Sequence, residues 1–160
     1  MFISELTTER LVLRPWPAEE AAAVVAGERR PHWAADFPAD GERTIGGIIA
    51  GNPDQPHGHR LIVERETGLL VGGIGLKWPP TEGAVEFGYG LVASRRCRGY
   101  ATEAVRALVA HARTLPGVTL VYATVDPANV PSVRVLEKAG LRRDGTVDSD
   151  EGLLHRYVAE

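Results

Sequence analysis

The sequence predicts an α+β domain: a mixed, mostly antiparallel central sheet of about seven strands, flanked on both faces by about four helices. Three observations predict this class. Short segments that alternate apolar and polar residues, separated by turn residues, dominate the first half of the chain. Two segments with helical apolar spacing follow in the second half, each leading into a strand-like segment. The length of 160 residues, without a repeat or a linker, is that of one domain spanning residues 1–160.

The N-terminal region predicts one strand followed by two helices. Residues 6–16 alternate in polarity and end at a pair of prolines, which favours a strand. Residues 18–28 combine alanines, valines and acids and end at Gly27, which is typical of a helix with a glycine cap. A second helix is expected around residues 44–50.

Three consecutive antiparallel strands are expected next, at residues 60–66, 69–76 and 84–92. Thr67-Gly68 supplies the first turn, and Trp78-Pro79-Pro80 separates the second strand from the third. This part of the chain is therefore predicted to be a meander.

The second half predicts a helix over residues 102–115, a strand over 118–125 and a helix over 131–139 that ends at Gly140. Nearly every residue of 118–125 is apolar or β-branched, so this strand is expected to be buried on both faces. Two closing strands are expected at 141–146 and 153–158.

Composition excludes several classes of function. The chain is 44% hydrophobic and 24% charged, with a net charge of -3 and a pI near 6.0, so it lacks the basic surface that nonspecific nucleic-acid binding needs. No apolar run reaches the roughly 18 residues of a membrane span, and no signal-like segment opens the chain. We therefore expect a cytoplasmic protein without nucleic-acid or membrane partners. Cys97 is the single cysteine, which excludes an intramolecular disulfide and a cysteine-based zinc cluster.

The most informative segment is the loop Ser94–Ala101, which joins a strand to a helix and carries three arginines around a glycine. A helix N-terminus presents unpaired N–H groups and partial positive charge, so it attracts phosphate. Gly99 would let the backbone approach a pyrophosphate, while Arg96 and Arg98 supply charge. The alternative is an ordinary solvated arginine loop.

On the preceding strand, Glu86, Gly88 and Gly90 share one face and the apolar residues share the other. Glycines inside a strand often mark the close approach of a ligand. Glu86 is then expected to stand alone beside an accessible groove, where it could act as a general base, unless it is simply a solvated glutamate. Asn129 and Ser132 open the last helix, either as capping residues only or as groups placed near the strand ends.

Three segments, EFGYGL, RRCRGYATEA and DPANVPSVRVLEKAGL, resemble the GNAT superfamily of acetyl-CoA-dependent N-acetyltransferases. The opening TTERLVLRPW is similar to the branch that contains ribosomal-protein N-terminal acetyltransferases. The resemblance implies that acetyl-CoA is the cosubstrate, with Leu91 at the pantetheine arm and Arg96, Gly99 and Ala101 in the Q/R-x-x-G-x-G/A signature. Asn129 matches a cofactor-contacting asparagine, Ser132 a hydroxyl near the thioester sulfur, and Glu86 the general base. The cofactor site implied in full comprises Leu91, Arg96, Cys97, Arg98, Gly99, Tyr100, Ala101, Thr102, Asn129 and Ser132.

The sequence departs from this family pattern at three positions. Gly90 stands where this branch often has an aromatic residue, which puts the acceptor pocket in doubt. Cys97 replaces a frequent glycine, and Leu141 replaces a frequent phenylalanine in the core.

The predicted function is an acyltransferase reaction, in which an acetyl group passes directly to a primary amine in a ternary complex. The expected acceptor is a peptide or protein N-terminus or a small α-amino compound. The alternatives are a non-catalytic acyl-CoA-binding sensor module and an acetyltransferase for a small molecule such as an antibiotic or polyamine. The sequence does not choose between a monomer and a homodimer.

Other candidate sites are weaker. Cys97 among arginines could carry a covalent acetyl group. His57 and His59 could bind a metal, yet no third ligand follows at suitable spacing, so we expect no metal. Residues 72–75 are glycine-rich but open no helix, which excludes a phosphate loop. The acceptor pocket is expected between the first helices and the loops around Trp33, Phe37, Trp78 and Tyr89.

Overall fold

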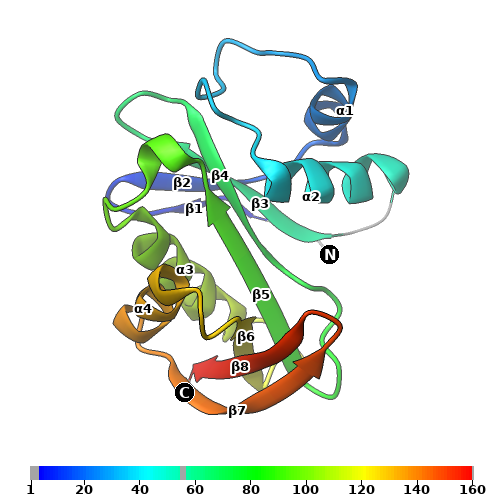
Figure 1. The fold of residues 1–160 in the computed structure, drawn as a ribbon. Coiled ribbons are helices and arrows are strands. Elements are labelled where there is room, and N and C mark those ends of the chain that lie inside the picture. The colour runs from blue at the N-terminus through cyan, green and yellow to red at the C-terminus, as the bar shows by residue number, and fades with distance from the viewer. Residues whose placement is uncertain (1–3, 55–56, 160) are drawn as a thin grey trace.

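The computed structural model describes residues 4–54 and 57–159, which form an α+β fold (Figure 1). Within these residues one sheet of eight strands has the order β1-β2-β3-β4-β5-β6-β8-β7. The strands are β1 (Leu6–Thr7), β2 (Leu11–Pro15), β3 (Gly58–Glu64), β4 (Leu70–Leu76), β5 (Ala84–Leu91), β6 (Leu120–Val125), β7 (Arg142–Ser149) and β8 (Gly152–Ala159). The helices are α1 (Ala18–Ala26), α2 (Asp40–Gly51), α3 (Tyr100–Ala112) and α4 (Val130–Lys138), with a short 3-10 helix η1 (Ala93–Arg95).

The predicted fold class is confirmed, and the differences in detail have local causes. The expected first strand divides into β1 and β2 because Thr8 N donates to Leu11 O at 2.8 Å and turns the chain. Helix α2 begins four residues earlier than expected, at Asp40, where the Glu42 carboxylate accepts a hydrogen bond from Ala39 N at 3.1 Å. The expectation of a fully buried strand at residues 118–125 is wrong, because buried and half-buried residues alternate along β6.

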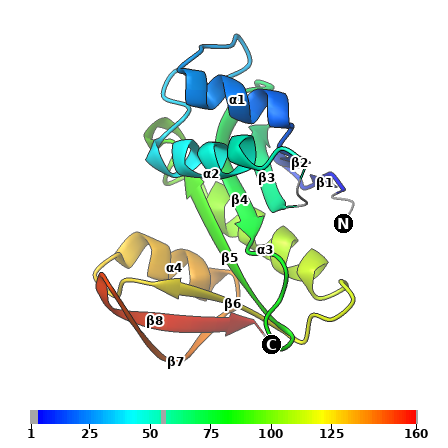
Figure 2. The same cartoon turned by 90° about the vertical axis from the view of Figure 1, so that its right-hand side faces the viewer.

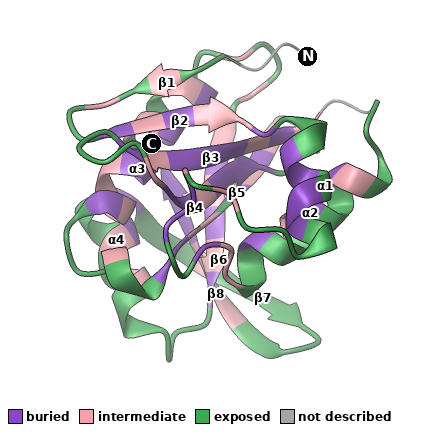
Figure 3. Ribbon diagram, turned by 90° about the horizontal axis from the view of Figure 1, so that it is seen from above, coloured by how far each residue is buried: buried purple, intermediate pink, exposed green. Residues whose placement is uncertain are grey.

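Helices cover both faces of the sheet, as predicted (Figures 1 and 2). Helices α1 and α2 pack on each other over one face, where α2 contacts β4. Helix α3 lies on the other face against β2, β4 and β5, with α4 beside it. The buried residues concentrate in the strands between these layers, while β7 is largely exposed (Figure 3). No helix in the described part of the chain has the length and apolar character that crossing a membrane requires.

Strand β5 separates from its parallel neighbour β6 halfway along its length. In the described structure the two strands pair only at Ala84, Val85 and Glu86, whereas β4 pairs with β5 as far as Leu91. The divergence of the two strands is visible in Figure 2. The sheet therefore opens along the second half of β5, on the side that faces β6.

Candidate active site

The open edge of β5 exposes backbone hydrogen-bonding groups. Lys77 N donates to Glu86 O, and Val92 N donates to Val71 O, so the even-numbered residues of β5 direct their backbone groups toward β4. Because alternate residues of a strand point their N–H and C=O groups to opposite sides, those of Tyr89 and Leu91 face the gap. Arg96 Nε donates to Leu91 O at 3.1 Å from this side. The edge can therefore accept another extended chain.

This edge leads into the arginine loop, residues 94–99, which ends at the first turn of α3. Cys97 and Gly99 adopt left-handed φ values of 64° and 82°. Gly99 is the N-cap of α3 and provides no side-chain cap, so the N–H groups of Tyr100, Ala101 and Thr102 lie at an uncapped helix start. The sequence-predicted phosphate site is thus a helix N-terminus next to an open strand edge.

A buried carboxylate anchors the arginine loop. Glu64 is 1% exposed and accepts hydrogen bonds from Thr67 Oγ1 at 2.7 Å, Tyr100 OH at 2.9 Å and Arg95 Nε at 3.0 Å. Arg98 Nη1 lies 3.7 Å from the same carboxylate. Burial alone would raise the pKa of Glu64, but these hydrogen bonds and the Arg95 charge outweigh it and lower the pKa below its usual value. The loop is therefore fixed before any ligand arrives.

Arg10 also contacts the arginine loop and the start of α3. Its Nε donates to Glu103 Oε1 at 2.8 Å, its Nη1 donates to Arg98 O at 2.7 Å, and its guanidinium lies 4.7 Å from the centre of the Tyr100 ring. A Cβ placed on Gly99 would lie 3.2 Å from Arg10 Nη2. The positive φ and the nearby Arg10 therefore favour glycine at position 99. The arginine at position 10 and the glutamate at position 64 carry no motif and were missed by the sequence analysis.

Glu86 faces the groove but does not stand alone, so that expectation is wrong. Thr124 Oγ1 donates to Glu86 Oε2 at 2.8 Å, and Lys77 Nζ lies 3.2 Å from Oε1. The neighbouring residues on the same face are bare: a Cβ on Gly88 would meet no atom within 4 Å, and one on Gly90 would meet only Glu42 Oε2, at 3.6 Å. The side-chain-free surface that the sequence predicted is present, with two carboxylates along it.

The start of α4 is joined to β5 through a tyrosine. Tyr89 OH donates to Ser132 Oγ at 3.1 Å, and burial raises the pKa of Tyr89. Asn129 is the N-cap of α4, and its Oδ1 accepts from Ser132 N at 3.4 Å. The capping interpretation of Asn129 is therefore observed, and Ser132 lies on the α4 side of β5, opposite Glu86.

A cavity of about 340 Å³ lies between α2 and the sheet, and we call it the glycine-floored cavity. Its floor follows from the register of two strands, which places Gly73 opposite Gly90 and Gly75 opposite Gly88. Its lining residues are Trp16, Gly41, Glu42, Thr44, Ile45, His59, Arg60, Gly73, Ile74, Gly75, Lys77, Gly88, Tyr89 and Gly90.

The residues expected around an acceptor pocket are brought together only in part at this cavity. Helix α2 contributes as predicted, but Trp33 and Phe37 are 3% and 0% exposed and pack in the core. Trp78 does not line the cavity, and the Tyr89 side chain turns toward Ser132. Another cavity, of about 470 Å³, lies beside β6, β7 and β8 and is separate from this groove.

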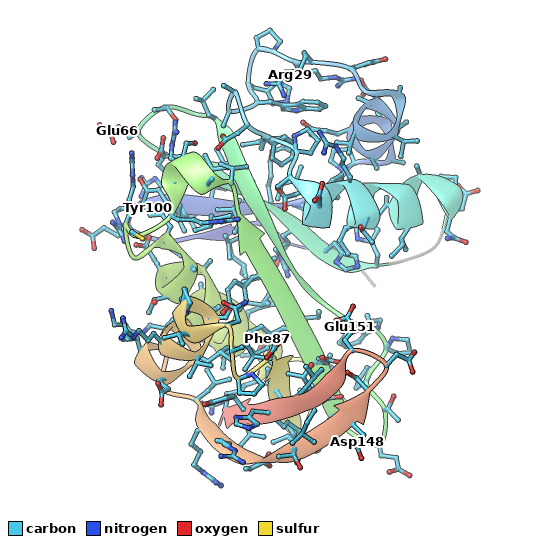
Figure 4. All side chains as sticks on the ribbon, viewed as in Figure 1. Arg29, Glu66, Phe87, Tyr100, Asp148 and Glu151 are labelled. Carbon is cyan, nitrogen blue, oxygen red and sulfur yellow. The ribbon has the colours of Figure 1, made fainter. Side chains whose placement is uncertain are left out.

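The structure adds little support for the other candidate sites. His57 and His59 stack at 5.7 Å, and burial, followed by the charges of His57 and Lys77, lowers the pKa of His59 to about 4. Within residues 4–54 and 57–159 no cluster of three or more possible ligands could hold a metal ion. Cys97 is exposed at the turn of the arginine loop. Figure 4 shows Tyr100 at the start of α3, far from Asp148 and Glu151 at the β7–β8 turn, which carries none of these groups.

Comparison with known proteins agrees with this geometry. The sequence profile of the Acetyltransferase (GNAT) domain matches residues 10–142. The chain therefore belongs to the GNAT acetyltransferase family, and the family predicted from the sequence is confirmed.

The proteins that this chain resembles include an N-acetyltransferase and an antibiotic-resistance protein. The uncharacterized N-acetyltransferase p20 of Bacillus licheniformis is 31% identical over 98 residues, which are 61% of this chain and 55% of p20. The kanamycin resistance protein of Rhizobium radiobacter is 40% identical over 60 residues, or 38% of this chain and 56% of that protein. The chain thus spans about half the length of these curated relatives. The structure of RimL, a ribosomal L7/L12 α-N-protein acetyltransferase in complex with coenzyme A, matches with a TM-score of 0.73 at 16% identity, covering 98% of this chain and 97% of RimL. That likeness shows the fold.

Proposed function

We propose that this protein transfers an acetyl group from acetyl-CoA to a primary amine, by direct attack of the amine on the thioester in a ternary complex. The observation that carries the proposal is the open edge of β5, which runs into the anchored arginine loop at the start of α3. Family membership supports the same reaction. RimL, of the same fold, is described in complex with coenzyme A.

The pyrophosphate of acetyl-CoA is proposed to bind the first N–H groups of α3, from Gly99 to Thr102, with Arg96 and Arg98 supplying charge. The pantetheine arm would lie along β5 as an added strand and use the backbone groups of Tyr89 and Leu91. Arg96 Nε, which donates to Leu91 O, would release that carbonyl when the arm binds. Backbone N–H groups at this edge would then stabilise the oxyanion that forms on the thioester carbonyl.

Two proton transfers remain. Glu86 is proposed to take a proton from the amine through water, since the open space above Gly88 leaves room for solvent between Glu86 and Gly90. Ser132, held by Tyr89 OH at 3.1 Å, is proposed to donate a hydrogen bond or a proton to the leaving sulfur. Asn129 fixes the start of α4 and so places Ser132.

The proposed acceptor is the α-amine of a peptide or protein, or a small α-amino compound. An α-amine of pKa near 8 is about one-tenth neutral at pH 7, whereas a lysine side chain is neutral in about one part in 2,500. A water-mediated base suits the former. A small-molecule antibiotic is the second candidate, because the kanamycin resistance protein is 40% identical over 60 residues.

The test is an acceptor screen that follows CoA release. We expect turnover with a peptide that has a free N-terminus, and slower turnover with the same peptide N-blocked and carrying one internal lysine. Faster reaction of the blocked peptide, or of kanamycin, would reject the α-amine preference. Binding of acetyl-CoA by calorimetry without turnover of any amine would favour the sensor module instead.

A further inference from the structure

Glu42 occupies an unusual position for a carboxylate. It lies in the first turn of α2, is 5% exposed, and lines the glycine-floored cavity. Its Oε1 accepts a hydrogen bond from Ala39 N at 3.1 Å and so caps the helix. Its Oε2 lies 3.6 Å from the Cβ position of Gly90, and no side chain in the described part of the chain donates to it. Oε1 of Glu42 therefore caps the helix, and Oε2 faces the cavity.

The protein leaves the Glu42 charge poorly compensated. Burial raises the pKa of Glu42, and although Ala39 N and the charges of Arg96 and Arg43 act in the opposite direction, they do not offset it. Arg96 Nε is engaged with Leu91 O. A bound cation would therefore stabilise the ionised form of this buried carboxylate.

The proposed acetyl transfer places the reacting amine at the Gly90 end of the cavity. Gly90 lies between Tyr89 and Leu91, whose backbone groups face the proposed thioester on the other side of the strand. Glu86 lies four residues back, roughly 13 Å along the strand at the level of the backbone. Of the two carboxylates on this face, Glu42 is the one in contact with the Gly90 position.

A second polar group lies beside Glu42. The Trp16 indole Nε1 is 4.0 Å from the Cβ position of Gly73, whose nearest neighbours also include Glu42 Cγ at 3.7 Å. An indole N–H can only donate a hydrogen bond, and Trp16 lines the cavity with its Nε1 beside the Gly73 floor position, where a ligand could accept that bond. The cavity thus offers a negative group and a hydrogen-bond donor side by side.

We propose that Glu42 binds the ammonium group of the acceptor at the Gly90 end of the cavity, with the Trp16 N–H donating to the carbonyl oxygen next to it. The substrate class is then an α-amino amide, such as the first residue of a peptide, and an amino acid with a free carboxylate is disfavoured by the buried Glu42 charge. The volume of about 340 Å³, at the low end for ligand cavities, fits one residue better than a multi-ring aminoglycoside. This inference rests on the proposed acetyl transfer. It assigns to Glu42 recognition of the ammonium form, and the proton that the amine must lose before it attacks the thioester passes through water to Glu86, as proposed above.

Three matched probes test the class: leucinamide, leucine, and 3-methylbutylamine, which lacks the carboxamide. CoA release is measured with each at saturating acetyl-CoA. We expect the highest kcat/KM for leucinamide. An equal or higher kcat/KM for leucine or for 3-methylbutylamine would overturn the assignment of an α-amino amide.

Two variants test the residue. Glu42→Gln keeps an oxygen for Ala39 N and removes the charge, so KM for leucinamide should rise roughly tenfold or more, with a smaller change in kcat. Gly90→Ala places a methyl group 3.6 Å from Glu42 Oε2 without a backbone clash and should raise the same KM. Asp40→Asn is the control, since it removes a fully exposed charge from the same helical turn and should change neither constant.

The possible failures are distinguishable. If both cavity variants keep the wild-type KM while acetyl transfer proceeds, Glu42 does not bind the acceptor. If the wild-type protein acetylates the free-N-terminus peptide of the acceptor screen but not leucinamide, this inference fails while the proposed function stands. If it binds acetyl-CoA but acetylates no amine at all, the proposed function fails and this inference fails with it. Calorimetry should give the same acetyl-CoA Kd for Glu42→Gln and the wild type, and a large loss would show that Glu42 acts through the cofactor site.

Discussion

The two sides of β5 are built in different ways. The arginine loop comes from one continuous segment and is fixed by the buried ion pair between Glu64 and Arg95, at 3.0 Å. The glycine-floored cavity is assembled from α2, β3, β4 and β5, and its floor exists because glycines of two strands fall opposite one another. The proposed cofactor half therefore lies in one segment, although its anchors come from distant parts of the sequence. The proposed acceptor half depends throughout on tertiary register. A substitution in the loop and one in the cavity therefore test separate parts of the proposed site.

The largest effect is expected from breaking the loop with Gly99→Val. A β-branched residue at φ 82° costs about 1–2 kcal/mol, and its side chain would push on Arg10. Loss of the contacts of the first α3 N–H groups to a pyrophosphate should raise the acetyl-CoA Kd on the order of 100-fold. Calorimetry measures the Kd, and thermal unfolding measures the strain.

The control for that variant is Gly117→Val. Gly117 also has a positive φ, 83°, and a Cβ there would meet no atom within 4 Å. It should lose similar stability and keep the wild-type Kd. Equal loss of binding in both variants would show that strain alone, and not the loop, governs affinity.

Glu86→Gln tests the proposed proton transfer, because Glu86 lies on the glycine face of β5 and not in the arginine loop. If Glu86 takes the amine proton through water, kcat should fall roughly 10- to 100-fold while the acetyl-CoA Kd stays unchanged. The measurement is kcat from pH 6 to 9 with a free N-terminal peptide. A kcat that matches the wild type over this range would remove Glu86 from the mechanism and leave the base to another group.

The sequence predicted the arginine loop well because its determinants are local. A glycine at a helix start and neighbouring arginines can be recognised within eight residues, and the alternation of Glu86, Gly88 and Gly90 follows from strand geometry alone. The contacts of Arg10 and Glu64 could not be predicted, because they join residues 88 and 31 positions apart. For the same reason Glu42 was missed: its role depends on the pairing of Gly73 with Gly90 and on α2 lying across them.

Glu64→Gln weakens the anchor without changing the loop sequence. The folded pKa of Glu64 lies below its usual value, so its carboxylate stabilises the fold above the unfolded pKa, and that stability is lost as the pH falls through the folded pKa. The variant should lose about 2 kcal/mol of unfolding free energy at pH 7. Its deficit relative to the wild type should shrink below about pH 4. Urea unfolding at several pH values measures this difference, and a deficit independent of pH would mean that packing, rather than charge, anchors the loop.

The smallest expected effect is a loss of stability in acid from His59, which lines the glycine-floored cavity. Burial, followed by the charges of His57 and Lys77, lowers the pKa of His59 to about 4, so the fold favours the neutral ring. A group of this kind stabilises the fold fully above the unfolded pKa of about 6.5, and the stability is lost as the pH falls from there toward 4. Because His59 is partly exposed, we expect a loss of about 1–2 kcal/mol over this window, and a flatter profile for His59→Gln. Urea unfolding between pH 7 and 4 compares the two proteins. Parallel pH profiles of the two proteins would show that protonation of His59 does not cause the loss of stability in acid.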